Sequence, residues 1–374
     1  MAYRFTAALI FLLLLSGQSY SKASRVPVFQ SEGMSIHSEL VTEGLQIPWG
    51  FDFIGSEEML VTERKGKLHR LNLETRKRVS ISGLPKFYVK SQGGLLDVIV
   101  HPQFSKNNLI YFTYATPYKS ENSVRLSQAV LKGNRLSNVK TLFTAEASSD
   151  NNIHFGSRLV FDKAGYLYMS IGDRGERDRA QDLSSHGGKI IRLKADGTVP
   201  KDNPFVGRKG ARPEIWTLGH RNPQGLAIHP KTGRIWEQEH GPRGGDEINL
   251  LKKGGNYGWP KVTYGKEYWG PSIGRKKGRG TIQPLHQFTP SIAPSGLTIY
   301  MGKAFPKWNG NVFSGAMKLT HINRQVYKKG KVIKEERLLD SWGQRIRNIK
   351  TGPDGFIYFS TDAGEIFRLV PRKK

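Results

Sequence analysis

Six times along the chain, a short apolar segment is followed by a turn and then by a second segment rich in β-branched and aromatic residues. The turns hold proline, glycine or charged residues, a pattern typical of β-hairpins. No long amphipathic helix is evident between the copies. The paired segments begin at Trp49 and Met59, Leu95 and Leu109, Arg158 and Tyr166, Gly225 and Gly233, Gly296 and Asn311, and Ile346 and Gly355.

The spacing of these hairpins predicts the architecture. Successive copies follow one another at intervals of about 45 to 70 residues, which suits four-stranded antiparallel blades with loops of variable length. We therefore expect an all-β protein, a six-bladed β-propeller. The ring would close by pairing a strand at residues 36–41 with the final blade, which ends near Leu369. A β-sandwich is the alternative, but it would not need six nearly equivalent hairpins.

The N-terminus resembles a secretory signal. One basic residue, Arg4, precedes an almost unbroken apolar run at residues 5–15, which is too short for a transmembrane helix. We predict a signal peptide at residues 1–21, a single propeller domain at residues 22–374, and a periplasmic protein that is not an integral membrane protein. A membrane anchor is the alternative. The chain has no cysteine, which excludes a lipoprotein anchor and disulfide bonds.

The formal net charge is +27, from 58 Lys and Arg against 31 Asp and Glu. These basic residues are scattered over the whole length, without a basic helix or an RNA-binding aromatic motif, so nucleic acid is not the expected partner. A solvated basic surface in contact with anionic envelope polymers is the preferred interpretation. An anionic ligand or an acidic redox partner would also be attracted by such a field.

The hairpins place certain polar residues at one common end of the propeller. Positions equidistant from a hairpin turn lie side by side. His154 is therefore expected beside Asp173, and Arg221 beside Gly241. The flanking positions of other hairpins fall at the same end, and these residues are Gln92, Lys318 and Arg345.

The residue types at this end suit acid–base chemistry on an anionic ligand. Asp173 can fix the tautomer of His154 and stabilise its charged form, which leaves the second ring nitrogen as a general base. A purely structural His–Asp contact is the alternative. Several cations surround the pair, namely Arg221, Lys318, Arg345 and Arg347. No serine or cysteine stands in a recognisable nucleophile motif, and no histidines have the spacing of zinc ligands.

Residues 239–249 form the segment densest in functional residue types. Its glycines expose main-chain carbonyls, and Asp246 and Glu247 supply carboxylate oxygens. Calcium prefers such hard oxygen ligands, so the segment is a candidate calcium site. A glycine-bent loop with solvated acids is the alternative.

The ordered motifs resemble a known family. Their sequences are Gln92-Gly-Gly-Leu-Leu, His154-Phe-Gly-Ser-Arg-Leu, Gly219-His-Arg-Asn-Pro-Gln-Gly, Glu239-His-Gly-Pro-Arg-Gly-Gly-Asp-Glu-Ile-Asn, Asn256-Tyr-Gly-Trp-Pro and Gly343-Gln-Arg-Ile-Arg. Over residues 45–369 the chain resembles the soluble aldose sugar dehydrogenases that use pyrroloquinoline quinone, relatives of soluble quinoprotein glucose dehydrogenase. Each motif alone is weak, but the ordered set is specific.

The resemblance implies roles for individual residues. His154 would be the proton acceptor, Asp173 its orienting partner, and Arg221 a cation near the reactive carbonyls of the quinone. The carbonyls of Gly241 and Pro242 would hold a calcium ion that touches the cofactor. The other implied cofactor residues are Gln92, Asn222, Tyr268, Ala316, Met317, Lys318, Arg345 and Arg347, and the implied ligands of a second calcium are Glu247 and Tyr257.

The resemblance also implies the reaction, which is oxidation of an aldose at C1 to a lactone. Electrons would pass to a quinone or cytochrome acceptor. One departure is that Ile153 precedes the catalytic histidine, where soluble glucose dehydrogenases have an acid, so sugar contacts are expected to differ. Two alternatives are a non-catalytic carbohydrate- or envelope-binding propeller and a calcium-dependent lactone hydrolase. The second would need metal-ligating acids from several blades.

Overall fold

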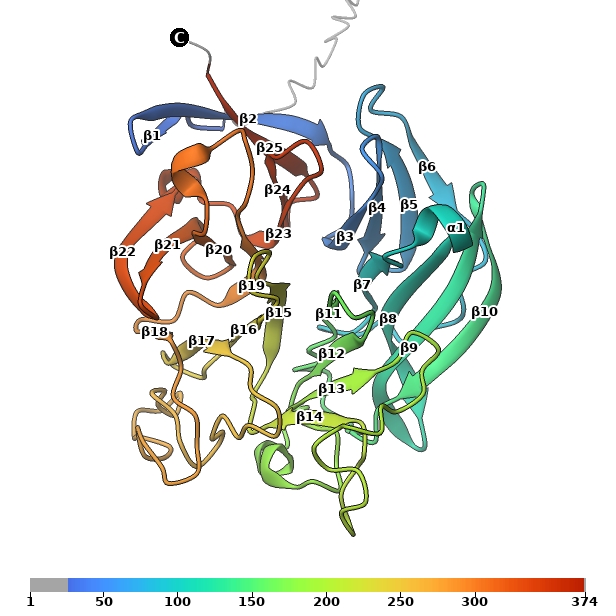
Figure 1. The fold of residues 1–374 in the computed structure, drawn as a ribbon, viewed down its shortest axis with the longest axis vertical. Helices are drawn as coiled ribbons and strands as arrows, with labels where there is room; N and C mark the ends of the chain where they lie inside the picture. The colour runs from blue at the N-terminus through green and yellow to red at the C-terminus, as the bar shows by residue number, and fades with distance from the viewer. Residues whose placement is uncertain (1–25, 373–374) are drawn as a thin grey trace, which may run out of the picture.

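The computed structural model describes residues 26–372, and the predicted signal peptide at residues 1–21 lies outside them. The described chain forms six antiparallel sheets arranged in a ring, with the blades visible around the central axis in Figure 1. Neighbouring inner strands contact one another around the whole ring. The predicted six-bladed β-propeller is confirmed.

Each blade contributes one strand to each of four concentric positions. The inner strands are β3 (Pro48–Ile54), β7 (Leu95–Val100), β11 (Leu159–Phe161), β15 (Pro223–Ile228), β19 (Pro294–Ile299) and β23 (Ile346–Thr351). The second strands are β4 (Glu58–Glu63), β8 (Leu109–Tyr118), β12 (Leu167–Ile171), β16 (Ile235–Glu239), β20 (Val312–Ala316) and β24 (Ile357–Thr361). These pairs are the six hairpins that the sequence predicts.

The two outer positions complete the blades. The third strands are β5 (Lys67–Asn72), β9 (Glu121–Lys132), β13 (Lys189–Leu193), β17 (Asp246–Leu250), β21 (Ile322–Lys328) and β25 (Ile366–Pro371). The outer strands are β6 (Arg78–Ile81), β10 (Arg135–Thr144), β14 (Ile215–Leu218), β18 (His286–Phe288), β22 (Lys331–Leu338) and β2 (Met34–Thr42), with β1 (Phe29–Ser31) beyond β2.

Helical structure in the described chain is confined to short segments. They are α1 (Phe104–Asn107) and the 3-10 turns η1 (Arg177–Gln181), η2 (Pro306–Trp308) and η3 (Asp340–Trp342). Among residues 26–372, no helix is both long enough and apolar enough to cross a membrane.

The ring closes by joining the two ends of the chain in one sheet. Strand β2 pairs antiparallel with β25, with Ser38 opposite Leu369 and Leu40 opposite Phe367. Figure 1 shows blue β2 lying beside red β25. The predicted closure is therefore confirmed, and it protects two sheet edges that would otherwise be free.

Burial decreases from the inner strands outward, which explains the hydrophobic pattern. All five residues of β12 are buried, because both faces of a blade pack against neighbouring blades. In contrast, most residues of the outer strand β22 are exposed or half-buried. The largest aromatic cluster, around Phe305, Trp308 and Phe313, fills the space between the fifth and sixth blades. The chain has no cysteine, so packing between blades, and not disulfide bonds, stabilises the fold.

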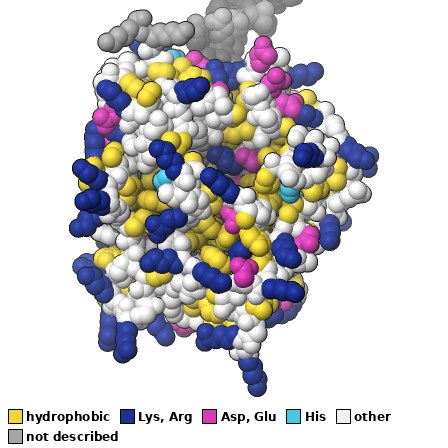
Figure 2. Space-filling model, in the orientation of Figure 1, with side chains coloured by type: hydrophobic (Ala, Val, Ile, Leu, Met, Phe, Trp, Pro, Cys, Tyr) yellow, Lys and Arg dark blue, Asp and Glu magenta, His cyan; other side chains and the backbone are white. Residues whose placement is uncertain are grey.

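On the face shown in Figure 2, basic side chains are dispersed rather than gathered into one stripe. Figure 2 shows Lys and Arg distributed over the whole of the viewed face, with fewer Asp and Glu between them. This distribution agrees with the scatter of basic residues along the sequence and differs from a nucleic-acid-binding groove.

Candidate active site

The predicted polar residues meet at the end of the propeller where the six inner strands begin, which we call the strand-start rim. His154 precedes β11 and contacts Asp173, which follows β12. Arg221 precedes β15, and its guanidinium donates a hydrogen bond to the Gly241 carbonyl at 3.1 Å. Both predicted neighbour pairs are confirmed, because each antiparallel hairpin returns its second strand to the end where the first began.

His154 is held by one contact through its side chain and one through its main chain. Its Nδ1 lies 2.6 Å from Asp173 Oδ1, and its main-chain N–H donates to Gln92 Oε1 at 2.9 Å. The residue adopts a positive φ of 52°, so the hydrogen bond from the second blade fixes an uncommon conformation. With Nδ1 engaged by the carboxylate, Nε2 is the nitrogen that remains for proton transfer.

Asp173 is a buried acceptor with three donors. Its Oδ1 also accepts from Gly175 N at 2.8 Å, and its Oδ2 accepts from Trp259 Nε1 at 2.8 Å. Burial opposes its ionisation, but the His154 hydrogen bond and the charge of Arg221 outweigh burial and lower the pKa of Asp173. The group is therefore an anion at neutral pH.

The environment also keeps His154 neutral. Its side chain is 12% exposed. Burial is the main reason that the pKa of His154 is lowered, and the contact with Asp173 offsets this in part. A neutral imidazole with an oriented, unprotonated nitrogen is the state that a general base requires.

The loop that carries His154 is fixed by a buried arginine. The guanidinium of Arg174 lies 3.8 Å from the centre of the Phe155 ring. It donates to the carbonyl of Ile153 at 3.0 Å and to that of Asn151 at 2.7 Å. Ile153 therefore contributes its main-chain carbonyl to the contacts that hold this loop.

Arg221 connects the His154 pair to the glycine-rich segment 239–249. Its main-chain N–H donates to Glu239, and its guanidinium donates to the His240 carbonyl at 3.2 Å as well as to that of Gly241. The guanidinium also lies 5.4 Å from the centre of the Trp259 ring, the same ring that binds Asp173. A fixed positive charge thus stands next to the base.

An axial cavity of about 210 Å³ opens among the blades. Five of the residues implied in cofactor binding line it, namely Gln92, Asn222, Met317, Arg345 and Arg347. Arg345 and Arg347 both bind Asp362, the former from Nε at 2.8 Å and the latter with two nitrogens at 2.7 and 2.8 Å. The cavity is therefore flanked by arginines with one shared carboxylate.

The other implied cofactor residues do not line the axial cavity. Arg221 lines a small neighbouring pocket together with Glu239 and Glu247. Ala316 is buried at the end of β20, and Lys318 is exposed. Tyr268 as a whole residue is 65% exposed, and its carbonyl accepts from Arg243 at 3.2 Å. Their part in cofactor binding stays a prediction.

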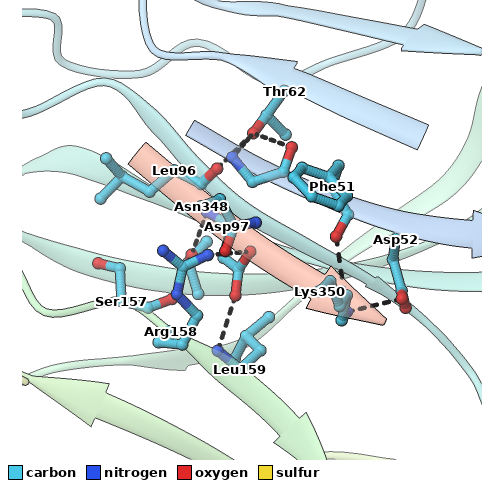
Figure 3. Close-up of polar contacts among 12 residues, drawn as sticks. Phe51, Asp52, Thr62, Leu96, Asp97, Ser157, Arg158, Leu159, Asn348 and Lys350 are labelled. Atoms are coloured by element: carbon cyan, nitrogen blue, oxygen red, sulfur yellow. Dashed lines mark hydrogen bonds and ion pairs between the residues drawn. The ribbon is translucent and has the colours of Figure 1, made fainter. Parts of the chain in front are cut away.

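A buried ion pair between Arg158 and Asp97, drawn in Figure 3, lies next to residues that line the cavity. Arg158 Nη1 lies 3.0 Å from Asp97 Oδ1, and Asp97 Oδ2 accepts from Leu159 N at 2.9 Å. The Arg158 guanidinium lies 4.2 Å from the centre of the Trp49 ring, and its Nε donates to the Gln224 carbonyl at 3.0 Å. Trp49 and Gln224 line the cavity, so this pair connects four blades and contacts two lining residues of the cavity.

A second cluster of charged residues is mainly acidic. It lies next to Arg221, whose main-chain N–H donates to Glu239. One ligand-type atom each of His220, Glu237 and Glu239 fall within 4.8 Å of one another. The Asn249 amide donates to Glu237 at 3.0 Å and to Glu247 at 3.3 Å. Burial, and then repulsion from Glu239, raise the pKa values of Glu237 and Glu247. Glu237 Oε1 is buried with no hydrogen-bond partner in the described chain.

This acidic cluster fits the chemistry of a hard cation, because buried carboxylates without cationic partners are costly unless a metal neutralises them. Of the two predicted ligands, Glu247 belongs to the cluster. Tyr257 stacks on His220 at 4.8 Å between ring centres, and its hydroxyl is bonded to the Leu250 carbonyl at 2.7 Å. Tyr257 thus contacts the cluster through the His220 ring, and its hydroxyl is already engaged.

Asp246 has a different role from Glu247. Its Oδ1 accepts from Gly241 N at 2.8 Å, and its Oδ2 accepts from Ser291 Oγ and from the main-chain N–H groups of residues 292 and 293. Both oxygens are occupied in fixing the loop. The expectation that Asp246 supplies a calcium ligand is therefore not supported.

Sequence reasoning missed several residues of this site. Trp259 lies within the quoted Asn256-Tyr-Gly-Trp-Pro motif, yet nothing in the motif shows that its indole reaches Asp173 from 86 residues away. Glu237 belongs to a strand whose alternation resembles ordinary packing. Asp362 and Arg64 each directly follow the second strand of their blade. This position does indicate a residue at the strand-start rim, so both residues could have been found from the sequence.

The chain is similar to known proteins over most of its length. A family described as glucose/sorbosone dehydrogenase matches residues 45–368. An aldose sugar dehydrogenase of Escherichia coli is 38% identical over 347 residues, which cover 90% of this chain and 94% of the relative.

Solved structures are similar over the same region. The apo-form of the soluble aldose sugar dehydrogenase from Escherichia coli superposes with a TM-score of 0.87 at 37% identity, over 90% of this chain and all of that chain. The pyrroloquinoline-quinone-bound aldose sugar dehydrogenase from Streptomyces coelicolor gives a TM-score of 0.75 at 25% identity, over 90% of this chain and 98% of that one.

Proposed function

Because the chain belongs to the glucose/sorbosone dehydrogenase family, we propose that it oxidises aldose sugars at C1 to lactones with pyrroloquinoline quinone and calcium. The observation that carries the proposal is the His154–Asp173 pair, a neutral and oriented base beside an arginine-flanked cavity. The solved relative with the quinone bound is named as an aldose sugar dehydrogenase, which supports the choice of cofactor.

The cavity fits an anionic aromatic cofactor. Arg64, Arg345 and Arg347 line it, and no carboxylate among the described residues does so. Burial, reinforced by Arg221, lowers the pKa of His240 to about 3, so this lining residue is neutral. A ligand with several carboxylates supplies the missing negative charge and can make paired hydrogen bonds with the arginines.

The residues of the site divide the chemical work. Pyrroloquinoline quinone, when bound, supplies an electrophilic carbonyl carbon that accepts hydride. His154 Nε2 takes the proton of the anomeric hydroxyl, and Asp173 stabilises the resulting imidazolium. Arg221 offers positive charge next to the base, where it favours negative charge that develops during the reaction. An external quinone or cytochrome would serve as the electron acceptor.

Calcium would occupy the acidic side of the site. Glu247, Tyr257 and the neighbouring Glu237 and Glu239 provide the buried oxygen ligands, and the unpartnered Glu237 Oε1 supports a cation there. The carbonyls of Gly241 and Pro242 remain the proposed ligands of the other calcium, the one that would touch the cofactor. In the structure, the Gly241 carbonyl accepts a hydrogen bond from Arg221.

A non-catalytic carbohydrate- or envelope-binding propeller is the second candidate function. It leaves unexplained why a buried carboxylate, a histidine and an indole are aligned at one rim. A lactone hydrolase is disfavoured because all carboxylates of the cluster come from β16 and β17 of one blade. We further propose that residues 1–21 direct export to the periplasm and that residues 22–374 act as one domain.

Reconstitution tests the proposal. Purified apo-protein is incubated with pyrroloquinoline quinone and calcium, and reduction of a redox dye is followed with a panel of aldoses. Aldose-dependent dye reduction that requires the cofactor is expected. His154→Ala should retain cofactor binding and lose at least ~10²-fold in turnover. Absence of dye reduction with every aldose would reject the enzyme function, and full activity in His154→Ala would reject the base.

A further inference from the structure

Arg64 occupies a special position in the first blade. It directly follows Glu63, which pairs with the first residue of the inner strand β3. The equivalent positions in blades four, five and six are His240, Met317 and Asp362. His240 and Met317 line the axial cavity, and Asp362 binds the two arginines there. The first blade therefore presents Arg64 to the cavity by the same geometry.

The main chain of Arg64 is fixed by both neighbouring segments. Its N–H donates to the Ile47 carbonyl at 3.1 Å, and its carbonyl accepts from Leu95 N at 3.0 Å. Gly94 allows this close approach, because a Cβ at that position would lie 1.9 Å from the Arg64 carbonyl oxygen. The main chain of Arg64 is thus held rigidly, and its side chain extends to the cavity lining.

The guanidinium of Arg64 differs from the other two arginines of the cavity. Arg345 and Arg347 share Asp362, whereas Arg64 makes no hydrogen bond or ion pair through its side chain with any residue in the 26–372 range. Burial, and then repulsion from Arg347, lower the pKa of Arg64. Three arginines and one carboxylate leave two positive charges uncompensated around one cavity, and Arg64 is the cation without a partner.

We propose that Arg64 is a further cofactor-binding residue, whose guanidinium binds a carboxylate of the bound quinone. This inference rests on the proposed function and adds a residue from the first blade to the site. The planar fork of arginine matches a carboxylate, and the hydrogen bonds are strengthened because both partners are charged and shielded from water.

Calorimetric titration of the apo-protein tests this role without measuring activity. Pyrroloquinoline quinone and its trimethyl ester are titrated, with calcium held constant, into wild type, Arg64→Met and Arg64→Lys. The expected result for Arg64→Met is a Kd about 10- to 100-fold weaker for the free acid, with the ester bound as tightly as by wild type. Arg64→Lys should be intermediate, because it keeps the charge and loses the fork.

Lys65→Met is the matched control, because it removes one positive charge from the next residue, which is exposed. It should bind the free acid like wild type. The melting temperature of apo Arg64→Met should not fall, since the variant relieves repulsion from Arg347. If Arg64→Met bound the acid like wild type, or lost equal affinity for acid and ester, the assignment would be wrong. If wild type bound neither the free acid nor the ester, the proposed function would be rejected, and this assignment with it.

Discussion

The substitution Asp173→Asn is the sharpest perturbation of the His154 base, because the carboxylate has no position for an N–H group. Oδ1 accepts from His154 Nδ1 at 2.6 Å and from Gly175 N at 2.8 Å, while Oδ2 accepts from Trp259 Nε1 at 2.8 Å. An amide NH₂ in place of Oδ2 opposes the indole donor. An NH₂ in place of Oδ1 would face the N–H of Gly175, so that two donors meet. It would also donate to His154 Nδ1 and so force the ring proton onto Nε2, the nitrogen that should accept the proton of the substrate.

Both orientations of the amide have a cost that can be estimated. One buried donor left without an acceptor costs about 1–3 kcal/mol, which should appear as lower stability of the variant. Loss of the correct tautomer removes general-base catalysis, worth about 10²- to 10⁴-fold in turnover. Cofactor affinity should change little, because Asp173 does not line the axial cavity.

The assay compares three proteins by dye-linked turnover, cofactor titration and chemical denaturation. Asp178→Asn is the control, since Asp178 is an exposed carboxylate of the nearby turn η1. It should match wild type in all three measurements. Wild-type turnover in Asp173→Asn would refute the role of the pair, and equal losses in both variants would indicate a general effect of charge.

Three further predictions follow from the electrostatics. Protonation of His154 stops the base, and burial lowers its pKa, so the acid limb of kcat/KM against pH should have its midpoint below 6.5; a midpoint above 6.5 would contradict the burial argument. Calcium at about 100 times its Kd should stabilise the metal-free protein by about 2.7 kcal/mol in thermal unfolding, and Glu247→Gln should lose this gain; an identical gain in the variant would exclude Glu247 as a ligand. Arg158→Met leaves Asp97 buried without its cation and should cost about 3–5 kcal/mol in denaturant unfolding, whereas an unchanged midpoint would show that the pair does not stabilise the fold.

The fold and the central pair were predictable because hairpin geometry is local. A strand, a turn and a returning strand fix which residues meet, so the contact of His154 with Asp173 follows from counting positions outward from one turn. The closure of the ring followed in the same way from the apolar patterns at both ends of the described chain.

The rest of the site depends on how blades are placed relative to one another, which no local pattern encodes. Trp259 reaches Asp173 from a loop of the next blade, and Glu237 faces His220 through strand pairing that resembles simple packing. Arg64 sits in the sequence Glu-Arg-Lys-Gly, which is typical of a solvated turn. Its orientation toward the axis becomes evident when the first blade is compared, position by position, with blades four, five and six.

A single-turnover experiment tests the central claim most directly. Protein loaded with oxidised pyrroloquinoline quinone and calcium is mixed anaerobically with an aldose, and the absorbance of the bound quinone is followed without any dye. We expect reduction of one quinone per chain with formation of one lactone, and a much slower change in His154→Ala. A loaded protein whose quinone spectrum stays constant with every aldose would contradict the account.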